Sequence, residues 1–353
     1  MFKGFVVRAL LAAALLLAAC GTKSETDGAA KKISVIAVTY PQYDWFKNVL
    51  GGRADSVDLK LLIKNGTDLH SYKPSAQDIA AIASTDMVVY VGGESDEWIE
   101  KALAATPKEG RVQINLMEAL GDRVKEEEVV EGMEHHHEHG EEAEGHDHEH
   151  HEHAKATEPA EATSEHHHHD EEEVENDEHI WLSLKNAEIL VKALAESIAK
   201  LDTAHAAEYH MNAALYIAKI SALDAQYRAT MENATLKTIL FGDRFPFRYL
   251  VDDYGIKYYA AFVGCSAESE ASFETITFLA GKMDSLALPA IFTIDGSDGK
   301  IARAILDASK NSKNAEVLIL NSMQSVKDGQ IKAGADYLSI MQDNLEVLKK
   351  AIK

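Results

Sequence analysis

Residues 33–63, ISVIAVTYPQYDWFKNVLGGRADSVDLKLLI, decide the fold of this chain. The stretch begins and ends with short runs rich in Val, Ile and Leu, which are typical of buried strands, and the residues after Tyr43 fit a helix. A strand, a helix and a second strand in this order are typical of parallel strands joined by a crossover helix. The stretch therefore predicts a mainly parallel sheet with helices packed on both faces.

The same alternation occurs on both sides of a central helical segment. The first block predicts strands at 33–39, 57–63, 86–91 and 111–116, with helices after Tyr43, Ser75 and Glu97. The second block predicts strands at 236–241, 257–262, 289–294 and 316–320, with helices around 247–253, 272–283, 298–309 and 335–351. Apolar residues at helical spacing resume at Ala187. The stretch from about Thr203 to Met231 lacks Pro and Gly and is long enough for a helix of about 40 Å.

This pattern predicts an α/β protein with two lobes, each a mainly parallel sheet flanked by helices, joined by one long rigid helix. In residue numbers, the N-terminal lobe takes 33–202, the linking helix 203–232 and the C-terminal lobe 235–353.

The net charge of −23 is concentrated in one segment. Residues 126–178 hold 22 Asp or Glu against the single Lys155, so the rest of the chain is nearly neutral. Because this segment has few apolar residues, we predict a disordered loop inserted in the first lobe. An acidic chain of this kind also argues against nucleic-acid binding.

The same loop holds 13 of the 17 histidines, which a solvated acidic linker does not explain. Neutral imidazole binds zinc, copper and nickel, so the loop is expected to collect metal. These accessory ligands are His135, His136, His137, His139, His146, His148, His150, His151, His153, His166, His167, His168 and His169.

Residues 1–19 are typical of a secretory signal peptide, with a short basic start and an apolar run that is too short to span a bilayer. The string LAACG at 17–21 resembles a bacterial lipobox, which predicts a lipid on Cys20 and a flexible tether at 20–32. The second cysteine, Cys265, then has no disulfide partner. We expect it to be a small buried apolar residue rather than a metal ligand.

Candidate ligands follow several of the predicted elements, and the carboxyl ends of parallel strands are where such sheets bind ligands. His70 lies after the strand at 57–63, and His179 follows the acidic loop. Asp243 follows the strand at 236–241, and Asp295 and Asp298 follow the strand at 289–294. Two imidazoles with one or two carboxylates suit a divalent transition metal.

The chain resembles the metal-binding receptors of bacterial zinc and manganese ABC importers. The stretch from TYPQYDW to EWIEKAL at 39–103, which includes NGTDLHSYKPS, resembles their N-terminal lobe, and EHIWLSLKNA at 178–187 resembles their second His motif. AESEASFETITFLAGKM at 267–283, NSMQS at 321–325 and YLSIMQDNLEVL at 337–348 match their C-terminal signatures. The resemblance covers about residues 33–125 and 178–353.

The resemblance implies that the metal lies in the cleft between the lobes and that His70 and His179 are ligands. The third family ligand usually begins a motif of His or Glu, two residues and an aromatic residue, and here Gly242 stands in that place. Asp243 could substitute for it. Either Asp295 or Asp298 could be the fourth ligand, and their spacing does not choose between them.

These observations predict an extracytoplasmic, lipid-anchored, non-catalytic and monomeric receptor that binds zinc and delivers it to the permease of an ABC importer. Manganese or ferrous iron is the alternative cargo within the same family. A metal-dependent hydrolase is a different class, which metal-stimulated hydrolysis would reveal. A zinc-buffering adhesin that uses the acidic loop alone is the third class, and deleting the loop would remove its tight binding.

Overall fold

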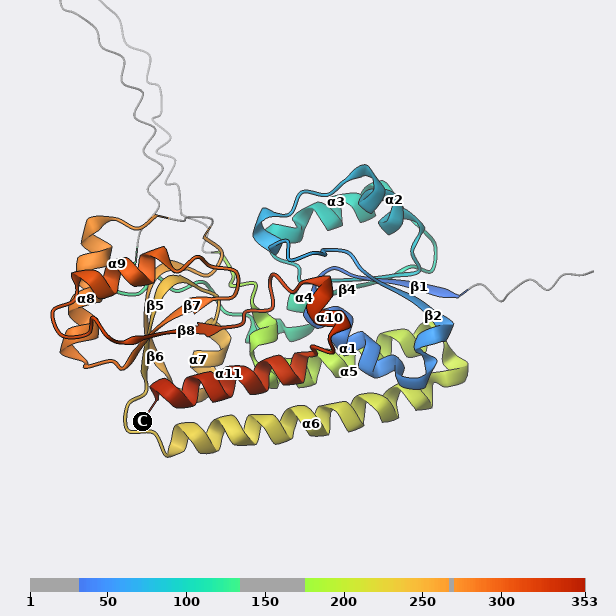
Figure 1. Ribbon diagram of the computed structural model, residues 1–353. Helices are drawn as coiled ribbons and strands as arrows, with labels where there is room; N and C mark the ends of the chain where they lie inside the picture. The colour runs from blue at the N-terminus through green and yellow to red at the C-terminus, as the bar shows by residue number, and fades with distance from the viewer. Residues whose placement is uncertain (1–31, 134–174, 267–269, 353) are drawn as a thin grey trace, which may run out of the picture. The chain divides into compact units, whose positions relative to one another are not determined.

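Two four-stranded parallel sheets form the centre of the computed structural model, which describes residues 32–133, 175–266 and 270–352 (Figure 1). The first sheet has the order β2-β1-β3-β4, and the second has the order β6-β5-β7-β8. The strands are β1 (Ile33–Ala37), β2 (Val57–Leu61), β3 (Met87–Tyr90), β4 (Val112–Asn115), β5 (Thr238–Phe245), β6 (Lys257–Val263), β7 (Ala290–Ile294) and β8 (Glu316–Leu320).

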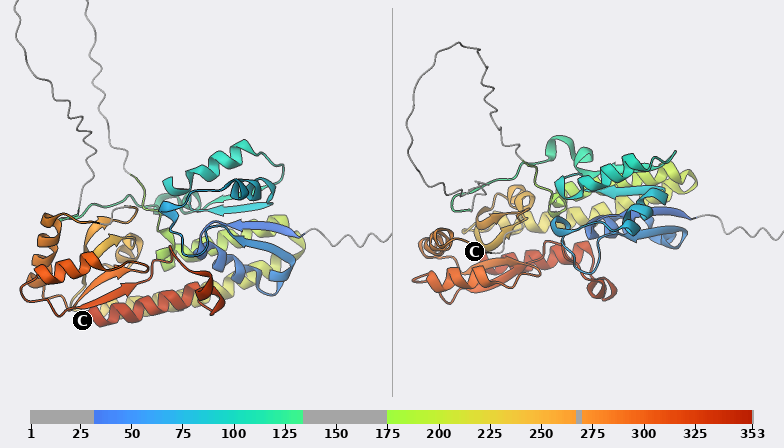
Figure 2. Two further views of the ribbon diagram at one scale, coloured as in Figure 1. Left: turned by 45° about the horizontal axis from the view of Figure 1, so that its top comes forward. Right: turned by 90° about the horizontal axis from the view of Figure 1, so that it is seen from above.

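Helices cover both faces of each sheet, as the two views of Figure 2 show. In the first lobe α2 and α3 cover one face, and α1 and α5 cover the other. In the second lobe α8 and α9 lie on one face, and α7 and α11 lie on the other. The helices are α1 (Tyr40–Leu50), α2 (Ala76–Ser84), α3 (Glu97–Ala105), α4 (Leu116–Leu120), α5 (Leu184–Leu201), α6 (Ala206–Glu232), α7 (Arg248–Tyr254), α8 (Phe273–Ser285), α9 (Lys300–Ala308), α10 (Asp328–Lys332) and α11 (Tyr337–Ala351).

The long helix α6 runs beneath both sheets (Figure 1). Its 27 residues correspond to about 40 Å at 1.5 Å per residue. The Tyr216 hydroxyl donates to Asp44 of α1 at 3.3 Å, and the Tyr227 hydroxyl donates to the Met341 carbonyl of α11 at 2.6 Å. Tyr337, the first residue of α11, also donates its backbone N–H to Asp44 at 3.1 Å. These buried bonds fix α6 and α11 against the first lobe.

The structure confirms the predicted fold class of two parallel sheets flanked by helices and one long helix. The predicted end of the strand at residue 241 is wrong, because β5 continues to Phe245 after an irregularity between Phe241 and Arg244. Asp243 therefore lies within the strand rather than after it. The short helices α4 and α10 were not predicted, and neither is longer than 5 residues.

Both ends of the acidic loop predicted at 126–178 are ordered, so the prediction of disorder is wrong at 126–133 and 175–178. Glu126 and Asn176 form an antiparallel bridge, and the backbone N–H of Asp177 donates to the Lys125 carbonyl at 2.8 Å. The accessory histidines at 135–169, the predicted signal peptide and Cys20 lie outside the described residues.

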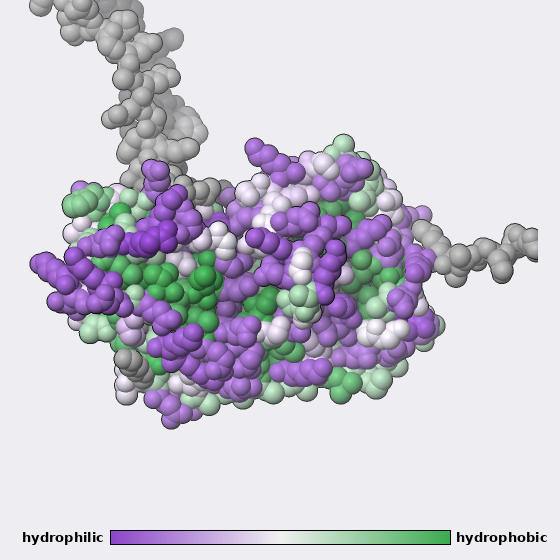
Figure 3. Space-filling model, in the orientation of Figure 1, coloured by the Kyte–Doolittle hydropathy of each residue, from purple (hydrophilic) through white to green (hydrophobic). Residues whose placement is uncertain are grey.

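Most of the surface in view is hydrophilic, as Figure 3 shows. The edge strand β8 exposes Val317 and Ile319. Across the described residues, no helix has the length and apolar character that a membrane crossing needs.

Candidate metal centre

Two imidazoles face each other between the lobes. The Nε2 atoms of His70 and His179 are 3.1 Å apart. Zinc bonds nitrogen at about 2.0–2.1 Å with tetrahedral angles, so two nitrogens on one zinc lie about 3.3 Å apart. The observed spacing is close to that distance, and both side chains are almost fully buried.

A carboxylate lies behind each ring, on the nitrogen that points away from the pair. Asp177 Oδ1 is 3.0 Å from Nδ1 of His179, and Glu178 Oε2 is 3.4 Å from Nδ1 of His70. The Ser95 hydroxyl is also 2.7 Å from Nδ1 of His70. An acceptor at Nδ1 favours the tautomer that carries hydrogen there, in which the Nε2 atom of each ring can bind a metal.

Local structure explains how the two rings come together. His70 lies in a short 3-10 turn after β2, and its backbone N–H donates to the Asp68 carboxylate at 3.0 Å. His179 directly precedes a second such turn, in which the buried Trp181 donates its indole N–H to the Ser322 carbonyl at 2.8 Å. Because Ser322 follows β8 of the second lobe, this bond holds the His179 segment across the cleft.

Burial is the largest effect on the pKa of His70 and lowers it well below its usual value. The neighbouring His179 and the guanidinium of Arg244 lower that pKa further, while Asp68 raises it. His70 is therefore a neutral imidazole at neutral pH, which is the form that binds metal.

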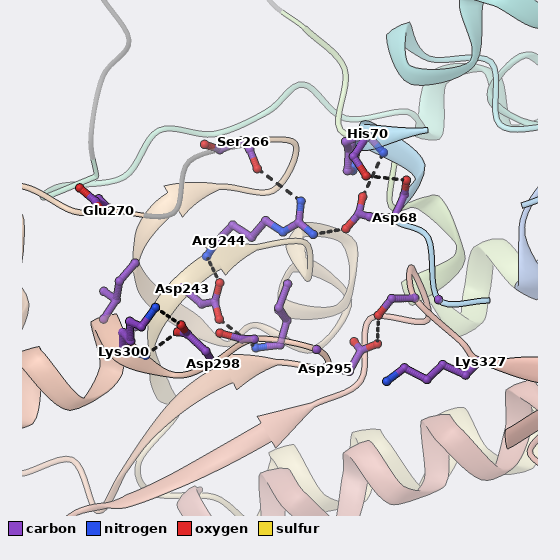
Figure 4. Close-up of a pocket in the computed structure, with 18 residues that line it drawn as sticks. Asp68, His70, Asp243, Arg244, Ser266, Glu270, Asp295, Asp298, Lys300 and Lys327 are labelled. Atoms are coloured by element: carbon purple, nitrogen blue, oxygen red, sulfur yellow. Dashed lines mark hydrogen bonds and ion pairs between the residues drawn. The ribbon is translucent and has the colours of Figure 1, made fainter. Parts of the chain in front are cut away.

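A cavity of about 600 Å³ opens beside His70 (Figure 4). All three predicted aspartates line it: Asp243, Asp295 and Asp298. Among the described residues, one group of His, Cys, Asp or Glu side chains has its ligand atoms close enough to share a metal ion, and it includes both imidazoles. None of the three aspartates belongs to this group. The structure therefore places these three predicted ligands on the cavity wall, outside that group.

The three aspartates differ in what they bind. Asp295 accepts hydrogen bonds from the backbone N–H and hydroxyl of Ser322, at 2.6 and 2.8 Å, and from the Ser325 hydroxyl at 2.9 Å. Asp298 pairs with Lys300 at 2.5 Å, and this pair lowers the pKa of the carboxyl. Asp243 accepts from the backbone N–H of Arg244 at 2.9 Å.

Position 242 has no room for a ligand. A Cβ on Gly242 would lie 2.5 Å from Cα of Ala302 in α9, far closer than such atoms approach. Two residues further on, Arg244 enters the cavity, forms an ion pair with Asp68 of the first lobe and donates to the Ser266 carbonyl at 3.3 Å (Figure 4). A permanent cation therefore lies beside the imidazoles, balanced by a carboxylate from the opposite lobe.

Sequence reasoning missed two residues that lie close to the imidazoles. The first is Cys265, which the sequence predicts to be a small apolar residue: the potential ligand atoms of His70, His179 and Cys265 all lie within 4.8 Å of one another. Cys265 follows β6, and the rule that ligands lie at carboxyl ends of strands could have found it. The second is Gln324, whose amide nitrogen is 2.8 Å from Nε2 of His179. The sequence offered no chemical signal for it.

The chain matches known proteins over nearly all of its folded part. The family model of the zinc-uptake complex component A, periplasmic, or ZnuA, matches residues 35–351. The high-affinity zinc uptake system protein ZnuA of Bacillus subtilis is 28% identical over 356 residues, which cover 100% of this chain and 99% of that protein.

A second relative is longer than this chain. The zinc-binding lipoprotein AdcA of Streptococcus pneumoniae is 31% identical over 96% of this chain, but the match spans only 58% of AdcA. The crystal structure of the Zn(II)-bound ZnuA-like domain of AdcA superimposes with a TM-score of 0.65 and 25% identity. That alignment covers 91% of this chain and 99% of the domain. Sequence and fold agree, and the chain belongs to the ZnuA family of periplasmic zinc-uptake components.

Proposed function

We propose that this protein is an extracytoplasmic zinc receptor that delivers its metal to the permease of an ABC importer. The observation that carries the proposal is the pair of Nε2 atoms 3.1 Å apart, with a carboxylate behind each ring. When both rings carry hydrogen on Nδ1, their Nε2 lone pairs meet at a spacing that one zinc ion can bridge, so the arrangement supports metal binding.

Zinc suits this donor set better than manganese or ferrous iron. Imidazole nitrogen favours zinc, whereas manganese prefers carboxylate, carbonyl and water oxygens. The carboxylates Asp177 and Glu178 stand behind the rings rather than beside the Nε2 atoms. The named relatives ZnuA and AdcA, described as zinc-uptake and zinc-binding proteins, support the same cargo.

The acidic loop is proposed to collect zinc for this site. Its two ends are joined by the bridge between Glu126 and Asn176. The second end continues directly into Asp177, Glu178 and His179, so the loop begins and ends beside the imidazoles. Lipid attachment at Cys20 would hold the receptor at the membrane, where a permease partner lies.

Two of the alternatives are less well supported. A hydrolase would need a general base beside a metal-bound water, but both nearest carboxylates contact the imidazoles on their Nδ1 side. We therefore propose binding and release without catalysis. An adhesin that uses the loop alone would not need the buried imidazole pair.

The proposal is tested by His70→Ala and His179→Ala, with zinc binding measured by chelator competition. Sites with about four ligands bind zinc with about 10–16 kcal/mol, so one ligand contributes several kcal/mol, and we expect a loss of roughly 100-fold or more. His210→Ala is the matched control, because His210 is an exposed imidazole on α6. Unchanged affinity in both site variants, with melting temperatures preserved, would reject the imidazole pair as the zinc site.

A further inference from the structure

Cys265 lies where a third ligand to the same metal would stand. It occupies the turn after β6, and its Sγ lies within 4.8 Å of the ligand nitrogens of both His70 and His179. Tetrahedral zinc with bonds of about 2.0 Å to nitrogen and 2.3 Å to sulfur places its donors roughly 3.3–3.6 Å apart. The three donors are therefore within about 1.5 Å of the spacing that one zinc requires.

The turn that carries Cys265 is held against the imidazoles. Gly264 packs so closely that a Cβ there would lie 3.0 Å from Cε1 of His179. The backbone N–H of Cys265 donates to Glu127 at 3.0 Å, which joins the turn to the segment that leads into the acidic loop. As a residue, Cys265 is half-buried in this turn.

Within the part of the chain that the structure describes, the two imidazoles have few other candidate partners for a metal ion. Asp243, Asp295 and Asp298 lie outside the ligand group, and Gly242 can carry no side chain. Arg244, which reaches the cavity from the same strand, cannot bind a cation. A thiolate supplies both the missing donor and a negative charge to offset that of the metal.

We propose that Cys265 binds the cargo metal as a thiolate, together with the imidazoles of His70 and His179. The thiol loses its proton to solvent, and the sulfur lone pair forms the bond to the metal. This inference rests on the proposed zinc receptor and deepens it, because a sulfur ligand favours Zn²⁺ and other soft metals and disfavours Mn²⁺. Cys265 is then a residue that determines which metal the receptor accepts.

The test uses Co²⁺ as a spectroscopic probe of the full chain carrying Cys20→Ser. Because the chain has two cysteines, Cys265 is then the only thiol, and the loop histidines produce no sulfur-to-metal band. We expect one equivalent of Co²⁺ to give a near-ultraviolet thiolate-to-cobalt charge-transfer band that zinc abolishes. Cys265→Ser should lose the band, and its zinc affinity should fall by about 100-fold while its preference for zinc over manganese narrows.

Asp298→Asn is the control, since Asp298 lines the same cavity but pairs with Lys300, and it should keep the band. Tight zinc binding by the parent without a thiolate band would overturn the role of Cys265 and leave the receptor intact. Because this outcome is measured on the parent protein alone, it does not depend on whether any variant folds. Absence of tight zinc binding in the parent would instead overturn both proposals.

Discussion

Replacing Asp177 with Asn should weaken zinc binding without removing any ligand. The Asp177 carboxylate is buried, lies 3.0 Å from Nδ1 of His179 and also accepts the backbone N–H of His179 at 2.8 Å. Asparagine keeps the size of the side chain and an oxygen acceptor, so the turn should still form. The substitution removes the negative charge that makes the imidazole a stronger donor.

The size of the effect follows from the geometry. A zinc ion on Nε2 of His179 would lie roughly 7 Å from the Asp177 carboxylate, given a contact of 3.0 Å behind the ring and a zinc–nitrogen bond of about 2 Å. At an effective dielectric constant of about 20, the attraction between the two charges is about 5 kcal/mol, which is a ceiling. Removing such a partner typically costs 10–100-fold in metal affinity. Because this carboxylate is buried, we expect a loss near 100-fold, or about 2.7 kcal/mol.

The assay is zinc titration against a fluorescent chelator, with the thermal melt of the metal-free protein as a check on folding. Asp202→Asn is the matched control, because Asp202 lies 2.8 Å from Nδ1 of His205, away from the site. It should leave zinc affinity unchanged. An Asp177→Asn protein that binds zinc within about twofold of the parent would refute the argument that this carboxylate tunes the ligand.

Three further predictions concern the loop and the cavity wall. Deleting 134–169 should lower the zinc stoichiometry and the salt-sensitive association rate of zinc, while the tight site remains. The rate is measured by stopped flow at two ionic strengths. Loss of the tight site would contradict this prediction and place a loop histidine among its ligands. Asp298→Asn and Asp243→Asn should leave zinc affinity unchanged in chelator competition, whereas Asp295→Asn should lower it about tenfold, because Asp295 fixes the turn that touches an imidazole. Equal affinities in all three variants would contradict this ranking. Gly242→Ser should destabilise the protein by about 1–3 kcal/mol in urea unfolding, through collision with α9, and unaltered stability would contradict that contact.

The fold was predictable because each element carries its own local signal. The apolar runs at 33–39 and 316–320 are typical of buried strands. The stretch after Thr203, which no Pro or Gly interrupts, is typical of a long helix. The end of β5 was not predictable, since Gly242 and Asp243 are typical of a turn. They lie in the strand because the residues on either side of them, Phe241 and Arg244, pair with Ala260 and Phe262 of β6.

The positions of the two imidazoles were predictable from motifs, and the distances of the other candidate residues from them were not. His70 and His179 stand in recognisable motifs, but the aspartates were chosen by their place after a strand, which fixes an edge of the sheet and not a distance. Cys265 follows a strand in the same way, but its place in the sequence does not indicate that its thiol lies within 4.8 Å of the imidazole nitrogens. The three-dimensional packing of Gly264 on an imidazole, which brings the thiol close, leaves no mark in the sequence.

The central claim is that the imidazole pair forms a tight, zinc-selective site, and its metal content tests that claim most directly. The full chain should be purified without a metal-affinity step and analysed by elemental analysis, followed by chelator competition with zinc and manganese. We predict one zinc ion per chain that resists the chelator and that excess manganese does not displace, in addition to weaker loop-bound zinc. A protein that retains no chelator-resistant zinc, or that binds manganese in preference, would contradict the account.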